Sequence, residues 1–190
     1  MKPAILGLMF SFFISCSSKL ENPVPSIFNG KKYTIAPGAH EADDNPFHFE
    51  TLHELKFKAK FDRSSIYMTV DPTNQNDVNK LLGYSDCGSF HEINSARFGW
   101  RWFNNQLEIM AYSYVNGIRP EPICVAVVAL NTVNSYSIKF HKDKYIFTVN
   151  DTNKVEVPKS CNYEGIRYKL YPYFGGDETA THEIRIWIEE

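Results

Sequence analysis

Hydrophobic and polar residues alternate with a period of two along most of this chain. Between residues 55 and 61, apolar side chains occupy every second position and lysines separate them. A strand with this pattern buries one face and exposes the other. Asn-Asn, Asn-Gly and Asn-Asp pairs, which favour tight turns, stand between several such segments. The pattern predicts eight to eleven short strands, among them residues 55–61, 96–102, 107–113, 136–140, 145–149 and 183–189.

Short strands joined by turns, with almost no helical periodicity, are typical of an antiparallel sheet protein. We therefore expect an all-β fold, in which two antiparallel sheets form a jelly-roll sandwich with at most one short helix. A different sandwich or a lipocalin-like barrel is the alternative. Six apolar side chains are expected to point into the core: Phe57, Phe61, Trp100, Ile109, Phe147 and Ile186.

Two segments depart from the alternation. Residues 76–82 fit a short helix, with Asn76 as its N-cap and Gly83 as its stop. Residues 123–130 are apolar on both faces, which predicts a central strand covered on both sides and a buried Cys124.

The N-terminus has the composition of a secretory signal. Lys2 precedes an apolar run from Ala4 to Ile14, which is shorter than the about 20 residues of a membrane-spanning helix. The run ends in Phe-Ile-Ser-Cys, which resembles the lipobox of bacterial lipoproteins, with Cys16 as the lipidated residue. A soluble secreted protein cleaved near Ser15 is the alternative.

The lipobox resemblance implies three segments. These are a signal peptide over residues 1–15, a lipidated cysteine with a tether and a first edge element over residues 16–45, and a β-sandwich domain over residues 46–190. It also implies a partner and a location: the chain is anchored by lipid to a bacterial membrane, at the outer membrane or the cell surface, because several acyl chains together give stable anchoring.

Three cysteines remain if Cys16 carries lipid, so they cannot all pair within the chain. An oxidising exterior permits one disulfide, with three choices of pair. Cys87 and Cys161 lie in polar, turn-rich segments, and their pairing is therefore favoured. The cysteines lie far apart in sequence, so no metal site is predicted, and no cofactor is expected.

Charge narrows the range of partners. Lysine and arginine number 20, aspartate and glutamate number 22, and the formal net charge of -2 argues against a nucleic-acid binder with a basic face.

Two stretches resemble a known group of jelly rolls. Residues 136–157 contain a strand, a turn and a second strand that ends in Phe-Thr-Val-Asn-Asp. Residues 170–176, Leu-Tyr-Pro-Tyr-Phe-Gly-Gly, precede the final strand. Both resemble the concanavalin-like lectin/glucanase and laminin-G-type jelly rolls. The resemblance implies that fold and a carbohydrate-related function, since members bind or cleave polysaccharides, although a fold alone does not define a function.

The catalytic motifs of that group are absent. The laminarinase pattern Glu-x-Asp-x-x-Glu is not found, and the nearest candidate strand supplies only Glu108. The alginate-lyase patterns Arg-x-Glu-x-Arg and Gln-Ile-His are also missing, since Gly99 stands between Arg97 and Arg101 where the acid would be. The two carboxylates of glycoside hydrolysis are therefore not visible in the sequence.

The densest cluster of polar and aromatic residues lies in a predicted hairpin. Arg97 and Arg101 share one strand face, and the next strand places Glu108, Tyr112 and Tyr114 on the matching face. We expect any ligand site here, because tyrosine stacks on sugar rings and arginine binds carboxylates. An acidic polysaccharide is the expected ligand. Cross-strand ion pairs that need no ligand are the alternative.

Three functions follow from these observations. The favoured one is a membrane-anchored lipoprotein that binds a polysaccharide or other glycan. The second is a polysaccharide lyase or hydrolase, in which His91 or a tyrosine would act as the catalytic base of a lyase. The third is a structural or assembly lipoprotein that contacts another envelope protein.

Overall fold

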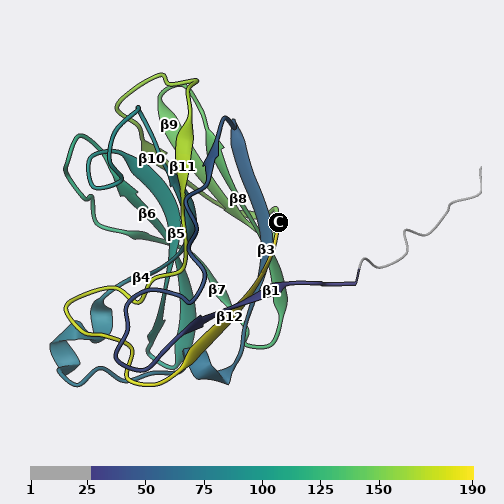
Figure 1. Ribbon diagram of the computed structural model, residues 1–190, viewed down its shortest axis with the longest axis vertical. Helices are drawn as coiled ribbons and strands as arrows, with labels where there is room; N and C mark the ends of the chain where they lie inside the picture. The colour runs from purple at the N-terminus through teal and green to yellow at the C-terminus, as the bar shows by residue number, and fades with distance from the viewer. Residues whose placement is uncertain (1–26) are drawn as a thin grey trace, which may run out of the picture.

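The computed structural model describes residues 27–190, so the signal segment and Cys16 lie outside the described residues. Within this range the chain forms twelve strands and two short 3-10 helices (Figure 1). The strands make two six-stranded sheets in which every neighbouring pair is antiparallel. The expected all-β, two-sheet sandwich is confirmed. No helix in residues 27–190 is long and apolar enough to cross a membrane.

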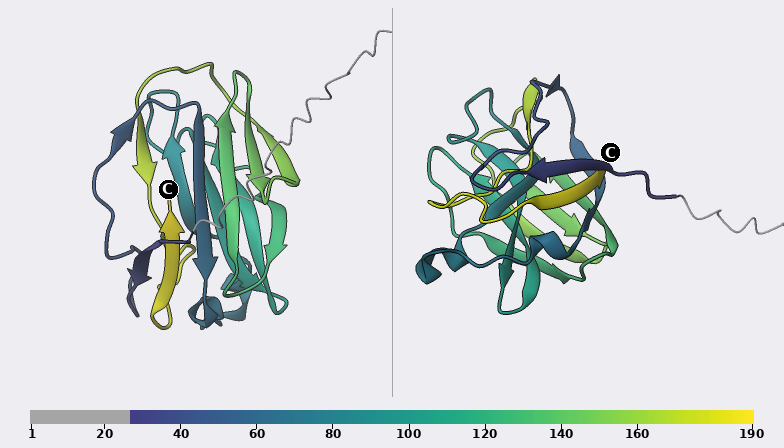
Figure 2. Two further views of the ribbon diagram at one scale, coloured as in Figure 1. Left: turned by 90° about the vertical axis from the view of Figure 1, so that its right-hand side faces the viewer. Right: turned by 60° about the horizontal axis from the view of Figure 1, so that its bottom comes forward.

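The first sheet contains both the first and the last strand of the described chain. Its strands lie side by side in the left view of Figure 2, in the order β1-β12-β3-β8-β9-β10. The edge strand β1 buries Tyr33 and Ile35 on its inner face, with Thr34 between them only partly buried. The strands are β1 (Lys31–Ile35), β12 (Ile184–Glu189), β3 (Glu54–Phe61), β8 (Val133–Phe140), β9 (Lys144–Val149) and β10 (Asn153–Pro158).

The second sheet packs against the first and bears the candidate site on its outer face. Its strand order is β2-β11-β4-β5-β6-β7. The strands are β2 (Phe49–Glu50), β11 (Arg167–Leu170), β4 (Asn79–Ser85), β5 (Ser95–Phe103), β6 (Gln106–Tyr114) and β7 (Ile123–Val128), and the 3-10 helices are η1 (Arg63–Ser65) and η2 (Pro72–Asn76).

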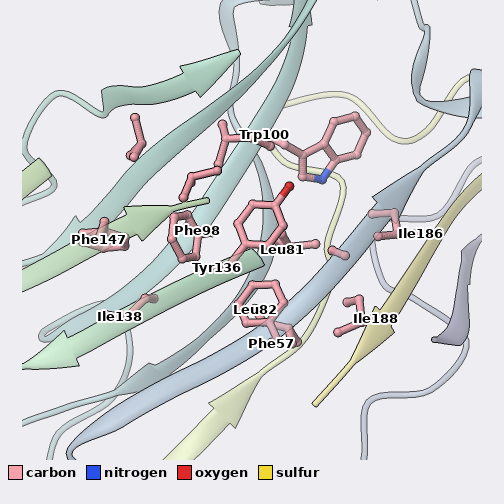
Figure 3. Close-up of a cluster of buried hydrophobic side chains, with 14 of the residues drawn as sticks. Phe57, Leu81, Leu82, Phe98, Trp100, Tyr136, Ile138, Phe147, Ile186 and Ile188 are labelled. Atoms are coloured by element: carbon pink, nitrogen blue, oxygen red, sulfur yellow. The ribbon is translucent and has the colours of Figure 1, made fainter. Parts of the chain in front are cut away.

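Aromatic side chains from both sheets fill the space between them (Figure 3). Phe57 of β3 stacks on Tyr136 of β8 with 5.0 Å between ring centroids. Phe98 of β5 meets the Tyr136 ring edge-on at 5.2 Å, across the sandwich. Such offset and edge-on arrangements add to the free energy of burying apolar area. All six residues predicted to point into the core are buried, with no more than 4% of any of them exposed.

The predicted central hairpin is confirmed as β5 and β6. Asn104 and Asn105 form its two-residue turn with φ of 50° and 61°, the left-handed values that asparagine tolerates in hairpin turns. The register places Arg97 opposite Tyr112. Because side chains alternate between faces, this turn sets which residues share the outer face.

The predicted helix at residues 76–82 is wrong, because most of this segment belongs to strand β4. The pairing of β4 with β5 shifts between Lys80 and Gly83. This irregularity places two consecutive residues, Leu81 and Leu82, in the core. A bulge of this kind interrupts the period of two, which is why the segment looked helical.

The prediction of a central strand over residues 123–130 is also wrong. Strand β7 is an edge strand, paired only with β6. Ile123 and Val127 are 47% and 54% exposed, and Cys124 is a free, exposed thiol rather than a buried one. The sequence carries apolar residues on both faces here, but only one face meets the other sheet.

Candidate functional site

A pocket of about 220 Å³ opens on the outer face of β4, β5 and β6. Strands supply most of its wall, the loop between β4 and β5 supplies two residues, and the segment after β11 supplies one. We call it the tyrosine pocket. It is lined by Lys80, His91, Glu92, Ser95, Arg97, Tyr112, Tyr114 and Tyr173.

Arg97 is the buried cation of the tyrosine pocket. Only 7% of the residue is exposed, and its Nη2 donates a hydrogen bond of 2.6 Å to the carbonyl of Tyr171. Its Nε has no hydrogen-bond acceptor, and none of the ion pairs in residues 27–190 includes Arg97. Burial lowers its pKa to about 10. A buried charge without a counter-charge is costly, and an anion entering the pocket would reduce that cost.

Lys80 supplies a second positive charge to the tyrosine pocket. Its Nζ lies 5.1 Å from the ring centroid of Tyr112 and 5.8 Å from that of Tyr173, within the range of cation–π attraction. Burial, followed by repulsion from Arg97 and Arg119, lowers the pKa of Lys80 to about 8. Sequence analysis missed this residue because it lies in the segment interpreted as a helix.

Two glycines allow the cations to lie where they do. A Cβ atom at position 83 would stand 2.2 Å from the Cβ of Arg97. Only glycine therefore allows β4 to approach β5 this closely at Arg97. A Cβ atom at position 175 would stand 2.1 Å from the Nζ of Lys80. The same Cβ atom would also stand 2.4 Å from the carbonyl oxygen of Val78, so two backbone segments approach each other closely beside Lys80.

Tyrosines give the pocket flat apolar surfaces and hydroxyl groups. The rings of Tyr112 and Tyr114 meet edge-on at 6.0 Å, and the guanidinium of Arg119 lies 5.8 Å from the Tyr112 ring. Burial, followed by the neighbouring Tyr114, raises the pKa of Tyr112 to about 12, so its hydroxyl stays protonated at neutral pH. Glu92 is the single carboxylate that lines the pocket, so positive charge predominates.

His91 enters the pocket from the loop between β4 and β5. The hydroxyl oxygen of Tyr168 accepts a hydrogen bond of 2.5 Å from its backbone N–H and lies 3.0 Å from its Nδ1. Burial, followed by repulsion from Arg97, lowers the pKa of His91. Tyr168 therefore holds the imidazole in place, and burial favours its neutral form.

Arg101 and Glu108, expected in the same site, lie outside the tyrosine pocket. They share its sheet face and oppose each other in the register. The Nε of Arg101 is 2.7 Å from a Glu108 oxygen, and each side chain is 17% exposed. Arg101 also donates to the carbonyl and side-chain oxygens of Asn76. Both groups are thus satisfied by the protein, and of the five expected ligand residues the pocket brings together Arg97, Tyr112 and Tyr114.

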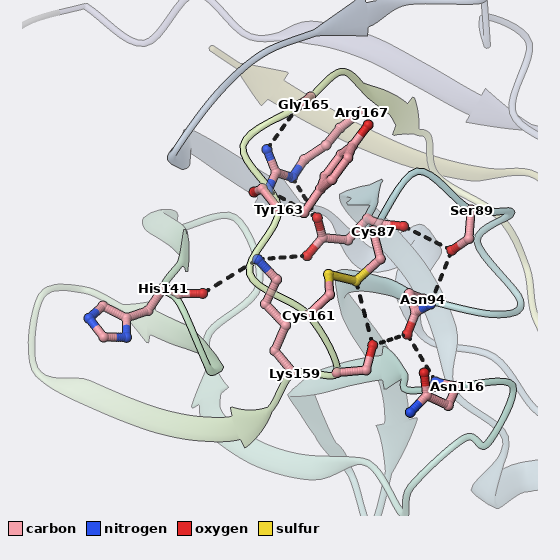
Figure 4. Close-up of a disulfide and its surroundings, with 12 residues drawn as sticks. Cys87, Ser89, Asn94, Asn116, His141, Lys159, Cys161, Tyr163, Gly165 and Arg167 are labelled. Carbon is pink, nitrogen blue, oxygen red and sulfur yellow. Dashed lines mark hydrogen bonds and ion pairs between the residues drawn. A yellow bond between two sulfur atoms is a disulfide. The ribbon is translucent and has the colours of Figure 1, made fainter.

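A buried ion cluster holds the loop that carries His91 (Figure 4). The carboxylate of Asp86 lies 3.1 Å from the Nζ of Lys159 and 3.0 Å from the guanidinium of Arg167, and all three side chains are at most 1% exposed. Next to this cluster, Cys87 and Cys161 form a disulfide with 6.0 Å between their Cα atoms. This is the pairing that sequence analysis favoured.

Asn94 ties the other end of the same loop. Its Oδ1 accepts hydrogen bonds from the backbone N–H of Asn116 at 2.9 Å and from the hydroxyl of Ser160 at 2.5 Å. Its Nδ2 donates to the hydroxyl of Ser89. The loop over residues 86–94 is therefore fastened at both ends to neighbouring segments.

No protein-family model and no curated protein sequence matches this chain. Solved structures match it in shape. The apo form of the Crh5 transglycosylase gives a TM-score of 0.53 at 12% sequence identity. The aligned region covers 92% of this chain and 78% of the transglycosylase chain. A Bacteroides ovatus mixed-linkage glucan GH16 protein in complex with its G4G4G3G product also gives a TM-score of 0.53, at 6% sequence identity. The aligned region covers 83% of this chain and 77% of that chain.

A third match is SCLam, a non-specific endo-β-1,3(4)-glucanase from family GH16. It gives a TM-score of 0.51 at 9% identity and covers 75% of this chain, which spans 58% of the glucanase's length. At these identities the matches show the fold. It is a concanavalin-like jelly roll, as the sequence resemblance implied.

The tyrosine pocket lacks the groups for glycoside hydrolysis. That reaction uses two carboxyl groups about 5–9.5 Å apart across the scissile bond. Glu92 alone lines the pocket, and Glu108 on the same face is occupied by Arg101. Within the tyrosine pocket, the fold shared with the hydrolases is therefore not accompanied by their pair of carboxyl groups.

Proposed function

We propose that this protein binds an acidic polysaccharide and that the tyrosine pocket holds one of its anionic sugar units. The observation that carries this proposal is Arg97, a buried guanidinium without an acidic counter-charge. A uronate carboxylate is a planar anion whose geometry suits a guanidinium. The glucan-bound relative and the glucanase share the fold, which supports a sugar polymer as the ligand.

Each group of the pocket has a role in this proposal. Arg97 and Lys80 bind the carboxylate, and Arg119 adds positive potential near Tyr112. Tyr112 and Tyr114 offer ring faces to the apolar side of a pyranose and hydroxyls to its polar groups. Neutral glucans lack the charge that the cations need, so we expect them to bind weakly.

We expect binding to weaken as the pH rises from about 7 to about 9. The pKa of Lys80 is about 8, so its ammonium is charged below that pH and lost above it, whereas a uronate stays ionised throughout. Losing one charged contact weakens binding about tenfold. Titration calorimetry with an oligouronate across this range measures the change. The Lys80→Arg variant, which keeps its charge, should show a flat profile, and an equal decline in that variant would contradict the assignment to Lys80.

A polysaccharide lyase is the second candidate. His91, whose neutral form is favoured because burial and Arg97 lower its pKa, lines the same pocket as the arginine that would neutralise a uronate. A neutral imidazole is able to remove a proton beside a neutralised carboxylate. Release of unsaturated uronates, detected by ultraviolet absorbance and lost in His91→Ala, would distinguish cleavage from binding alone.

We further propose that the domain is anchored to a bacterial membrane through lipid on Cys16. The lipobox-like Phe-Ile-Ser-Cys sequence at residues 13–16 supports this. Mass spectrometry of the membrane fraction should find an acylated Cys16 as the first residue. Cys16→Ala should move the protein to the soluble fraction, and a membrane fraction unchanged by this substitution would contradict lipidation.

A further inference from the structure

The tyrosine pocket has room for little more than one sugar unit. Its volume of about 220 Å³ lies below the about 300–1,000 Å³ of pockets that enclose whole drug-sized ligands. If a polymer binds there, its neighbouring units lie on the surface around the pocket. The character of that surface therefore decides whether the protein distinguishes a polymer from a single sugar.

Exposed apolar side chains flank the pocket residues His91 and Glu92 on both sides. Phe90 immediately precedes this pair and Ile93 follows it, and they are 76% and 44% exposed. Ile118, 69% exposed, stands on the next loop, which is joined to the first by a hydrogen bond from the N–H of Gly117 to the carbonyl of Ile93. We call Phe90, Ile93 and Ile118 the apolar rim.

The apolar rim rests on rigid loops. The N–H groups of Ile93 and Asn94 both donate to the carbonyl of Phe90, at 2.9 and 3.1 Å. The Cys87–Cys161 disulfide and the Asn94 hydrogen bonds hold the same loop. A surface that is already ordered loses little entropy when a ligand binds. An exposed phenylalanine on such a support is a preformed stacking surface.

We infer that the apolar rim is a second subsite, in which Phe90 stacks on the sugar unit next to the one held by Arg97. This rests on the proposed function, since it assigns the rim to the same acidic polysaccharide. Phe90 and Ile93 directly precede and follow the pocket residues His91 and Glu92 in the chain, and the C–H face of a pyranose matches an exposed aromatic ring. The protein thus recognises an oligomer: the pocket binds the charged group of one sugar unit, and the rim contacts the ring of the next unit.

The test compares ligand lengths with the full chain and defined probes. Oligogalacturonates and oligomannuronates of one to six units are titrated into the parent, Phe90→Ala and Met68→Ala. Met68 is a matched control because it is 81% exposed and lies near Trp102, at the far end of β5. We expect Phe90→Ala to weaken hexamer binding about tenfold, to leave monomer binding unchanged and to keep the parent's circular-dichroism spectrum.

The outcomes separate the rim from the pocket. Equal hexamer affinity in the parent and Phe90→Ala, with binding still lost in an Arg97 variant, overturns the rim as a subsite and leaves the proposed function intact. Equal losses in Phe90→Ala and Met68→Ala also overturn it. If no oligouronate binds the parent at any length, the proposed function fails and the second subsite fails with it.

Discussion

The Arg97→Met variant should bind oligouronates about 10- to 100-fold more weakly than the parent, as expected when charge-assisted hydrogen bonds are removed. Arg97 is the one buried cation among the residues that line the tyrosine pocket. Methionine matches the length of its aliphatic stem and carries no charge. Because the guanidinium already lacks an acidic partner, the substitution removes a desolvated charge rather than breaking an ion pair, and the fold should survive.

Arg101→Met is the matched control for this experiment. Arg101 lies on the same strand face but is paired with Glu108 and Asn76, so its loss should leave oligouronate affinity nearly unchanged. Isothermal titration calorimetry gives both affinities, and circular dichroism confirms that both variants are folded. Equal losses in the two variants would point to a diffuse electrostatic effect of the sheet face, and no loss in Arg97→Met would exclude the tyrosine pocket as the site.

Asp86→Asn should destabilise the protein by about 3–5 kcal/mol, the range seen when one member of a buried ion pair is removed. Asparagine keeps the shape of the side chain, but it leaves Lys159 and Arg167 with two buried positive charges and no carboxylate. The carbonyl groups of Leu52 and Tyr163 still accept hydrogen bonds from Arg167. They carry only partial charge and cannot replace a full negative charge.

Urea denaturation of the parent and variant measures the free energy of unfolding. Glu156→Gln is the control, because Glu156 pairs with Lys144 and Lys154 at the surface of the first sheet, where ion pairs contribute little to stability. Its unfolding midpoint should stay close to that of the parent. If Asp86→Asn shifts the midpoint no more than Glu156→Gln does, the buried cluster is not what secures the loop beside the pocket.

Local pattern was enough to predict the hairpin that forms the centre of the site. Alternation set the faces of β5 and β6, and the Asn104–Asn105 turn set their register. Arg97 and Tyr112 were therefore placed on one surface correctly. The same pattern did not show that Arg101 and Glu108 satisfy each other, because pairing depends on the side-chain geometry across strands and on Asn76, which comes from a different segment.

The local sequence pattern could not predict that Lys80 and Tyr173 line the pocket. Lys80 reaches the pocket because a bulge in β4 changes which residues face outward. Tyr173 reaches it through a bridge to Lys80 that joins segments more than ninety positions apart in sequence. Neither relation leaves a periodic signal in the chain.

The sequence by itself determined the class of fold, the inner faces of its strands and the cysteines most suited to pair. A period of two encodes the first two properties directly, since burial of apolar side chains decides which face turns inward, and the polar, turn-rich segments around Cys87 and Cys161 favoured their pairing. Only the tertiary structure decided which strand is an edge, where β4 bulges and which charges are left without counter-charges. These depend on which segments meet in space, so Cys124 proved exposed, while Arg97 proved to be buried without an acidic partner.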